Sequence, residues 1–143
     1  MKTIITAVLL ALALGACTSM PPGQEPLASH QVPAARIYIQ EMAMQRPGLA
    51  EVQFSRTSTF LNSNWPVALE INDVVLALML PGEHMSIWLK PGNSYHFSIK
   101  PEHGLSTSVY PDNRAIDLEL TAPDVYKVHI DADIKGMILR RED

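Results

Sequence analysis

Residues 66–100 read PVALEINDVVLALMLPGEHMSIWLKPGNSYHFSIK, and apolar side chains occupy every second position through most of this stretch. Such alternation is typical of β-strands that have one face on a hydrophobic core. Three turn signals divide the stretch, namely Asn72-Asp73, Pro81-Gly82 and Pro91-Gly92-Asn93. The stretch therefore predicts four short strands.

The parity of the apolar residues sets the expected loop lengths. A two-residue turn at 72–73, a four-residue loop at 81–84 and a three-residue loop at 91–93 keep the apolar side chains on one face. We therefore expect one antiparallel meander of four strands over residues 66–100. The expected facing pairs of its first hairpin are Ile71–Val74, Leu69–Leu76 and Val67–Leu78.

The second face of this meander is the candidate contact surface. In the expected register Trp88 lies opposite His96, and His84 lies opposite Lys100. Trp88 on an outer face would stack on a sugar ring or a protein partner; alternatively, it packs beneath an element of a second sheet. His84 and His96 lie several residue pairs apart, so they are not expected to share a metal ion.

The same alternation continues outside this stretch. It occurs at residues 36–40, 116–120 and 126–131. Short strands at this spacing predict an all-β fold, a single antiparallel β-sandwich of about 7–9 strands. Residues 41–48 (EMAMQRPG) form the one helix-friendly segment, which we interpret as a loop. The charged residues 140–143 would discourage the edge of the sheet from pairing with a strand of another chain.

The N-terminus, MKTIITAVLLALALGAC, has the layout of a secretory signal peptide. Lys2 gives a positive start, an apolar run extends from Ile4 to Leu14, and small Gly15-Ala16 follow. The apolar run is about half the roughly 20 residues that a membrane-spanning helix requires. We therefore interpret residues 1–16 as a signal peptide.

Leu14-Gly15-Ala16-Cys17 resembles the bacterial lipobox, and Cys17 is the only cysteine. The resemblance implies cleavage before Cys17, lipidation of its thiol and acylation of the new amine, with palmitate among the three acyl chains. Stable membrane attachment needs two or more chains. Thr18 stands where the family's retention signal has aspartate, which implies an outer-membrane anchor facing the periplasm. The alternative is an ordinary signal peptide and a chance cysteine.

Residues 17–33, the lipidated cysteine and a Pro-rich tether, separate this signal from residues 34–143, the expected β-sandwich domain. Lipidation of Cys17 leaves no thiol for a disulfide, so core burial alone must hold the domain together. Removing Lys2 from the 11 basic residues leaves 10, against 15 acidic ones. This net negative charge argues against nucleic acid as a partner.

Several segments of the sequence resemble those of a known protein family. They are residues 35–39 (ARIYI), Arg56, Phe60, residues 66–77 and the turn at 89–92 (LKPG). It comprises uncharacterised bacterial envelope lipoproteins with a PEGA-like or carboxypeptidase-regulatory-like β-sandwich. The resemblance spans roughly residues 35–99 and implies a fold and an envelope location, with no catalytic residues. Asp73 replaces the family's hairpin glycine, and the histidine of the second turn falls late, at His96.

Patterns that carry chemistry are sparse in this sequence. It contains no GxSxG, HxH, HExxH or CxxC motif. His129 and Asp131 share one face of a late strand and could touch an ion, or they could be separate surface residues. Asp117 and Glu119 alternate on another strand, as acids on an exposed face do. We therefore expect no enzymatic activity, no metal and no cofactor.

The sequence predicts a lipid-anchored cell-envelope lipoprotein that acts as a non-catalytic binding or structural module in the periplasm. The lipid on Cys17 is expected to anchor the protein to the membrane, and another envelope protein is the expected partner. The alternative is a carbohydrate- or peptidoglycan-binding domain, or an envelope enzyme, that uses the face of Trp88 and His96.

Overall fold

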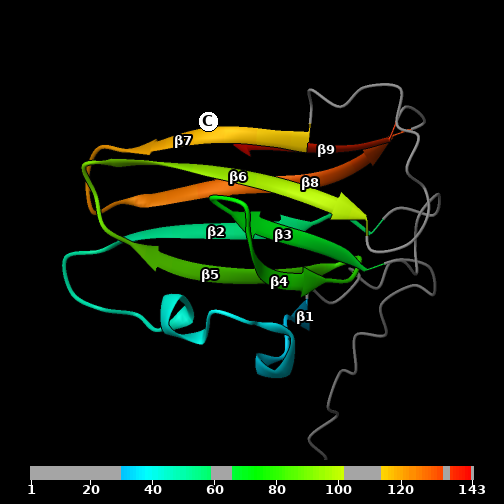
Figure 1. Ribbon diagram of the computed structural model, residues 1–143, viewed down its shortest axis with the longest axis horizontal. Helices are drawn as coiled ribbons and strands as arrows, with labels where there is room; N and C mark the ends of the chain where they lie inside the picture. The colour runs from blue at the N-terminus through cyan, green and yellow to red at the C-terminus, as the bar shows by residue number, and fades with distance from the viewer. Residues whose placement is uncertain (1–29, 59–65, 102–113, 134–135, 143) are drawn as a thin grey trace, which may run out of the picture.

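The computed structural model describes residues 30–58, 66–101, 114–133 and 136–142. Over these residues the chain forms two β-sheets stacked on each other (Figure 1), which confirms the all-β sandwich. The strands are β1 (His30–Gln31), β2 (Ala50–Arg56), β3 (Val67–Ile71), β4 (Val74–Met79), β5 (Glu83–Leu89), β6 (Asn93–Pro101), β7 (Ala115–Leu120), β8 (Val125–Asp133) and β9 (Gly136–Glu142). Two short 3-10 helices are η1 (Ala34–Arg36) and η2 (Gln40–Ala43).

The strands divide into a five-stranded sheet of order β1-β5-β2-β8-β9 and a four-stranded sheet of order β4-β3-β6-β7. Most neighbouring strands are antiparallel, but β1 with β5 and β2 with β8 are parallel pairs. The β2–β8 pair joins the first long strand of the domain to its penultimate strand. This pair forms the middle of the five-stranded sheet.

The expected four-stranded meander is wrong beyond its first hairpin. β3 and β4 pair, but β5 crosses to the five-stranded sheet and β6 returns to the four-stranded sheet beside β3. Inward side chains of both sheets face the same core. Apolar alternation therefore cannot distinguish a strand beside its neighbour from a strand in the opposite sheet. The two Pro-Gly turns are correct as turns, with Gly82 at φ +77° and Gly92 at φ +83°.

The register of the first hairpin is also corrected, because a bulge lies between Leu69 and Glu70. Ile71 faces Val74 as expected, but Leu69 faces Ala77 rather than Leu76. A bulge adds one residue on one strand and reverses the parity beyond it. Leu76 and Ala77 are consequently both buried, and Met79 rather than Leu78 enters the core.

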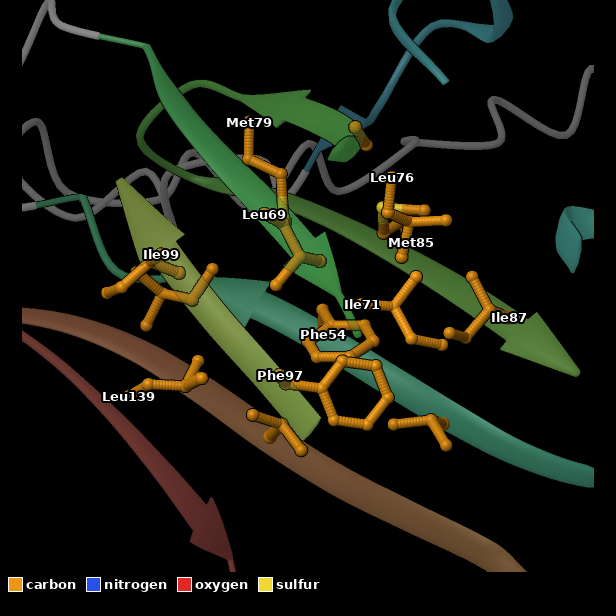
Figure 2. Packing of buried hydrophobic residues seen from close by; sticks show 14 of the residues in the cluster. Phe54, Leu69, Ile71, Leu76, Met79, Met85, Ile87, Phe97, Ile99 and Leu139 are labelled. Carbon is orange, nitrogen blue, oxygen red and sulfur yellow. The ribbon is translucent and has the colours of Figure 1, made fainter. Parts of the chain in front are cut away.

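The core between the sheets is centred on Phe54 of β2 and Phe97 of β6 (Figure 2). Their rings meet edge to face, with centroids 5.1 Å apart and planes at 65°. Such pairs add to the free energy of burial because the positive ring edge meets the negative ring face. The other large, fully buried side chains are Leu69, Leu76, Met79, Met85, Ile87, Ile99, Leu118, Leu120, Ile130 and Val52.

The N-terminal part of the domain differs from expectation in two ways. Residues 36–40 do not form a strand: Arg36 ends η1, Gln40 begins η2, and Ile37 between them makes a single bridge to Ala77 of β4. η2 occupies the start of the segment interpreted as a loop. His30–Gln31 pairs with β5, and Val32 is buried. The folded part therefore includes residues 30–33, which the sequence assigns to the tether.

The turn into β8 is fixed by Tyr126. Its hydroxyl accepts hydrogen bonds from the backbone N–H groups of Thr121 (3.0 Å) and Ala122 (3.2 Å). This arrangement ties the start of β8 back to the end of β7, as tyrosine corners do in other sandwiches. The hydrogen bond with the Thr121 side chain, and then that with the Ala122 backbone, lower the pKa of Tyr126.

Candidate binding face

The outer face of the five-stranded sheet gathers polar side chains from four strands, and we call it the groove face. Its members are Glu51, Gln53 and Ser55 on β2, His84, Ser86 and Trp88 on β5, Lys127, His129 and Asp131 on β8, and Arg140 and Glu142 on β9. These residues are exposed or half-buried, and they alternate with the core residues of the same strands.

The register of the sheet sets Ser55 between two histidines. Ser55 pairs with His84 on β5 and with His129 on β8. Side chains at paired positions project from the same face and lie about 5 Å apart at their Cβ atoms. The three side chains therefore form one row across the centre of the groove face.

A hydrogen-bonded chain runs from Ser55 through His129 to Glu142. Ser55 Oγ lies 2.6 Å from His129 Nδ1, and His129 Nε2 lies 2.8 Å from Glu142 Oε2. An ionised carboxylate only accepts hydrogen bonds, so Nε2 carries the proton in the neutral imidazole. Nδ1 is then the acceptor, and the Ser55 hydroxyl donates to it. Two lone pairs of Ser55 Oγ are left for other donors.

The same contacts keep Glu142 ionised. The hydrogen bond from His129, and then the charge of Lys127, lower the pKa of Glu142 below the ordinary value of a glutamate. Lys127 Nζ lies 3.8 Å from Glu142 Oε2. Glu142 is therefore a carboxylate at neutral pH and holds the His129 tautomer in place.

A groove of about 260 Å³ lies over this part of the sheet. Its polar lining is Gln53, Ser55, His84, Ser86, Lys127 and His129. Gln53 pairs with Ser86 on one side and Lys127 on the other, so the lining consists of two adjacent rows of the sheet. Residues that carry hydroxyl, amide, imidazole and ammonium groups thus line one small volume together with Phe54 and Met85.

Trp88 lies two residues beyond Ser86 on the same face of β5. It is half-buried and pairs with Glu51 of β2. The Gln53 side chain donates to Glu51 Oε1 at 3.1 Å. This hydrogen bond links the row of Trp88 to the row that lines the groove.

The structure does not bring the four predicted contact residues onto one surface. His84 and Trp88 belong to β5 in one sheet, whereas His96 and Lys100 belong to β6 in the other sheet. His96 pairs with Asp117, and its Nδ1 lies 2.7 Å from Asp117 Oδ1. The predicted pairing of Trp88 with His96 and of His84 with Lys100 is therefore wrong, because β5 and β6 are not neighbours.

Lys100 and Ser98 instead satisfy a buried acid on the outer face of the four-stranded sheet. Glu70 is 4% exposed, and its Oε2 accepts from Ser98 Oγ at 2.9 Å and from Lys100 Nζ at 2.8 Å. The hydrogen bond to Glu70, and then the charge of Glu70, raise the pKa of Lys100. A buried carboxylate needs such partners, so this cluster has a structural explanation.

A second buried charge cluster closes one end of the sandwich. Glu83, at the start of β5, accepts from Leu80 N at 2.7 Å and binds the Arg36 guanidinium through both carboxylate oxygens. Arg56, at the end of β2, donates to Met79 O at 2.5 Å. Burial lowers the pKa of Arg56 to about 10, and the charge of Glu83 acts in the opposite direction. These contacts tie η1, β2, β4 and β5 together.

The described residues contain no group of three or more His, Cys, Asp or Glu side chains that could hold a metal ion. His129 and Asp131 do share the groove face, but Asp131 binds Arg140 Nε (2.6 Å) and the Thr57 hydroxyl (2.5 Å). Asp117 is occupied with His96. Cys17, Trp65, His103 and the serines near 106 lie outside the described residues.

The local sequence pattern does not predict the hydrogen-bonded chain from Ser55 to Glu142, and it does not predict strands β2 and β9. A weak signal was present, because Val52 and Phe54 alternate with Glu51, Gln53 and Ser55. The parallel pairing of β2 with β8 could not be read from that signal. It joins residues 74 positions apart.

No protein-family model and no curated protein that was searched matches the chain. The groove face is accordingly the candidate site on three observations. These are its paired register, its hydrogen-bonded histidine and its groove.

Proposed function

We propose that this chain is a lipid-anchored lipoprotein of the bacterial cell envelope, held at the outer membrane and facing the periplasm. We also propose that its β-sandwich acts there as a non-catalytic binding or structural module, with another envelope protein as partner. The observation that carries the proposal is the sequence Leu14-Gly15-Ala16-Cys17 after an apolar run. Its resemblance to the lipobox supplies both the anchor and the location.

The start of β1 at His30 sets the length of the tether in this proposal. Residues 18–29 separate Cys17 from β1, and a chain of that length reaches at most about 40 Å. A tether of that length would hold the sandwich near the membrane surface. Among the residues that the structure describes, no helix is long and apolar enough to cross a membrane.

Membership of the PEGA-like lipoprotein family is part of the same proposal. The fold expected from that resemblance is a β-sandwich, and the chain is one. Among the residues of the resemblance, Leu69 and Ile71 are buried in the core and Gly92 lies in a turn with positive φ. They support a shared fold and leave the ligand to the groove face.

Cell fractionation tests the anchor. The wild-type protein should sediment with outer membranes, and Cys17→Ser should appear in the soluble or inner-membrane fraction. Thr18→Asp is the matched variant, because it keeps the lipidated cysteine and changes only the expected retention signal. It should move the protein to the inner membrane. Unchanged outer-membrane association of Cys17→Ser would contradict the proposal.

An envelope enzyme is the second candidate, and one specific observation favours it. Ser55, His129 and Glu142 are connected in the order nucleophile, base and carboxylate, as in hydrolases that use an activated serine. Ser55 lies, however, next to the last residue of β2, and this strand pairs with a neighbour on both sides at Ser55. The backbone N–H groups near Ser55 are used in the hydrogen bonds of the sheet. Such N–H groups are the usual donors to an oxyanion. The binding function is therefore preferred.

A further inference from the structure

We propose that the groove over Gln53, Ser55 and Ser86 binds one sugar unit of a neutral saccharide, and that Trp88 packs against the next unit. This inference deepens the proposed binding function and rests on it. It adds a saccharide ligand on the groove face to the envelope-protein partner proposed above. The residues that carry it lie on β2, β5 and β8.

The chemistry of the lining matches alternating hydroxyl groups. Each sugar hydroxyl both donates and accepts, so a saccharide site needs donors and acceptors side by side. Gln53 and Ser86 face each other across β2 and β5, and they offer an amide and a hydroxyl. Lys127 adds a donor on the other side of Gln53. Adjacent sheet positions about 5 Å apart suit neighbouring hydroxyls on one ring.

Ser55 adds an acceptor whose direction is fixed by the protein. Its proton is directed to His129 Nδ1, and Glu142 holds that tautomer. Ser55 Oγ therefore presents lone pairs to the groove and receives a hydrogen bond from a ligand hydroxyl. A hydroxyl that is already oriented loses little conformational entropy when a ligand binds.

The charges of the groove face disfavour an anionic ligand. Glu51, Asp131 and Glu142 outnumber Lys127 and Arg140 on this face, and Arg140 is already paired with Asp131. A phosphate or an acidic peptide would meet repulsion from the carboxylates and find one ammonium group near the groove. A neutral polyhydroxyl ligand meets no such penalty.

The size of the groove sets the length of ligand that it holds. Pockets for drug-sized ligands enclose roughly 300–1,000 Å³, and this groove has about 260 Å³. It thus accommodates one ring, and further affinity must come from the surface beside it. Trp88 lies on that surface, two residues after Ser86 on the same face of β5. Its ring can there cover the apolar face of a second sugar.

The test is a titration of the full-length protein, purified in detergent, with chitotetraose and with maltotetraose. Isothermal titration calorimetry should show saturable binding of at least one of the two. Loss of a single hydrogen bond corresponds to roughly a fivefold loss of affinity. Gln53→Ala and Ser86→Ala should each weaken binding by about that factor, and Trp88→Ala should weaken it more. Ser94→Ala, on an exposed position of the other sheet, is the matched control and should leave affinity unchanged.

Absence of binding to both saccharides, or equal binding by wild type and the Gln53, Ser86 and Trp88 variants, would overturn the proposal. Saturable binding of inorganic phosphate at the same groove would overturn the ligand class. The chitotetraose and maltotetraose arms distinguish an amino-sugar polymer from a plain glucan, and binding of either supports the inference. Membrane fractionation is independent of this titration, so a failed anchor and a failed saccharide site give different results.

Discussion

Ser55 and His129 lie 74 positions apart in the chain, and their side chains share a 2.6 Å hydrogen bond across the parallel pair of β2 and β8. The bond exists because the first long strand of the domain lies beside the penultimate one. Glu142 of the last strand completes the chain of hydrogen bonds. Three separate strands, β2, β8 and β9, must therefore dock correctly before this chain of hydrogen bonds is formed.

The lowered pKa of Glu142 predicts how stability depends on pH. Because the folded-state pKa lies below the unfolded value near 4.5, the ionised Glu142 stabilises the fold above that pH. The contribution should fade as the pH falls from 4.5 through the folded pKa. We expect the melting temperature of the wild type to exceed that of Glu142→Gln at pH 7. Thermal unfolding between pH 7 and pH 3 should show this difference shrinking in that window. A constant difference between the two proteins would contradict the assignment.

The pair of Phe54 and Phe97 should dominate the stability of the core. Phe54 is 1% exposed and contacts Phe97 edge to face. Phe54→Ala should lower the free energy of unfolding by about 3–5 kcal/mol, measured by urea denaturation. Val74→Ala is the control, because Val74 is 55% exposed and should change little. Similar losses from both substitutions would place the core elsewhere.

The turn between β3 and β4 offers a stabilising substitution. Asn72 and Asp73 both have positive φ, 48° and 65°, as a two-residue hairpin turn requires. Glycine adopts this conformation without a Cβ clash, so Asp73→Gly should raise the free energy of unfolding by about 0.5–1 kcal/mol. Asp73→Val should lower it, because a β-branched residue is strained there. If Asp73→Gly instead destabilises the protein, the Asp73 side chain stabilises the turn by more than its positive φ destabilises it.

A covalent probe separates the binding module from the hydrolase alternative. We expect a fluorophosphonate, which labels activated serines, to leave Ser55 unmodified at neutral pH. Mass spectrometry of the treated full-length protein measures this directly. Labelling that disappears in Ser55→Ala and persists in Ser86→Ala would instead establish an activated nucleophile. Ser86 is the suitable comparison because it lines the same groove.

The sequence predicted which side chains are buried better than it predicted which strands pair. Met85, Ile87, Phe97 and Ile99 are all in the core as their alternation indicated. The same alternation predicts that all four strands belong to one sheet, but β5 lies in the five-stranded sheet and β3, β4 and β6 lie in the four-stranded sheet. The alternation cannot distinguish the two arrangements, because both sheets point apolar side chains at one core. Local periodicity specifies the face of a strand, whereas strand neighbours depend on contacts that are distant in sequence.

The groove face was beyond sequence reasoning for the same reason. Trp88 and His84 were correctly placed on one face of one strand, but their partners come from β2 and β8 rather than from β6. The bulge after Leu69 is a further feature without a sequence signal, since no glycine marks it. The Asn72-Asp73 turn and the two Pro-Gly turns, by contrast, have local sequence signatures that predict them.

The central claim is that Cys17 carries the lipid anchor, and mass spectrometry of the N-terminal peptide tests it most directly. The full-length protein should be isolated from the membrane fraction and digested before measurement. We predict a first peptide that begins at Cys17 and carries the mass of three acyl chains on the thioether-linked glycerol and the amine. A first peptide that retains residues 1–16, or that begins at Cys17 with a free thiol and a free amine, would contradict it.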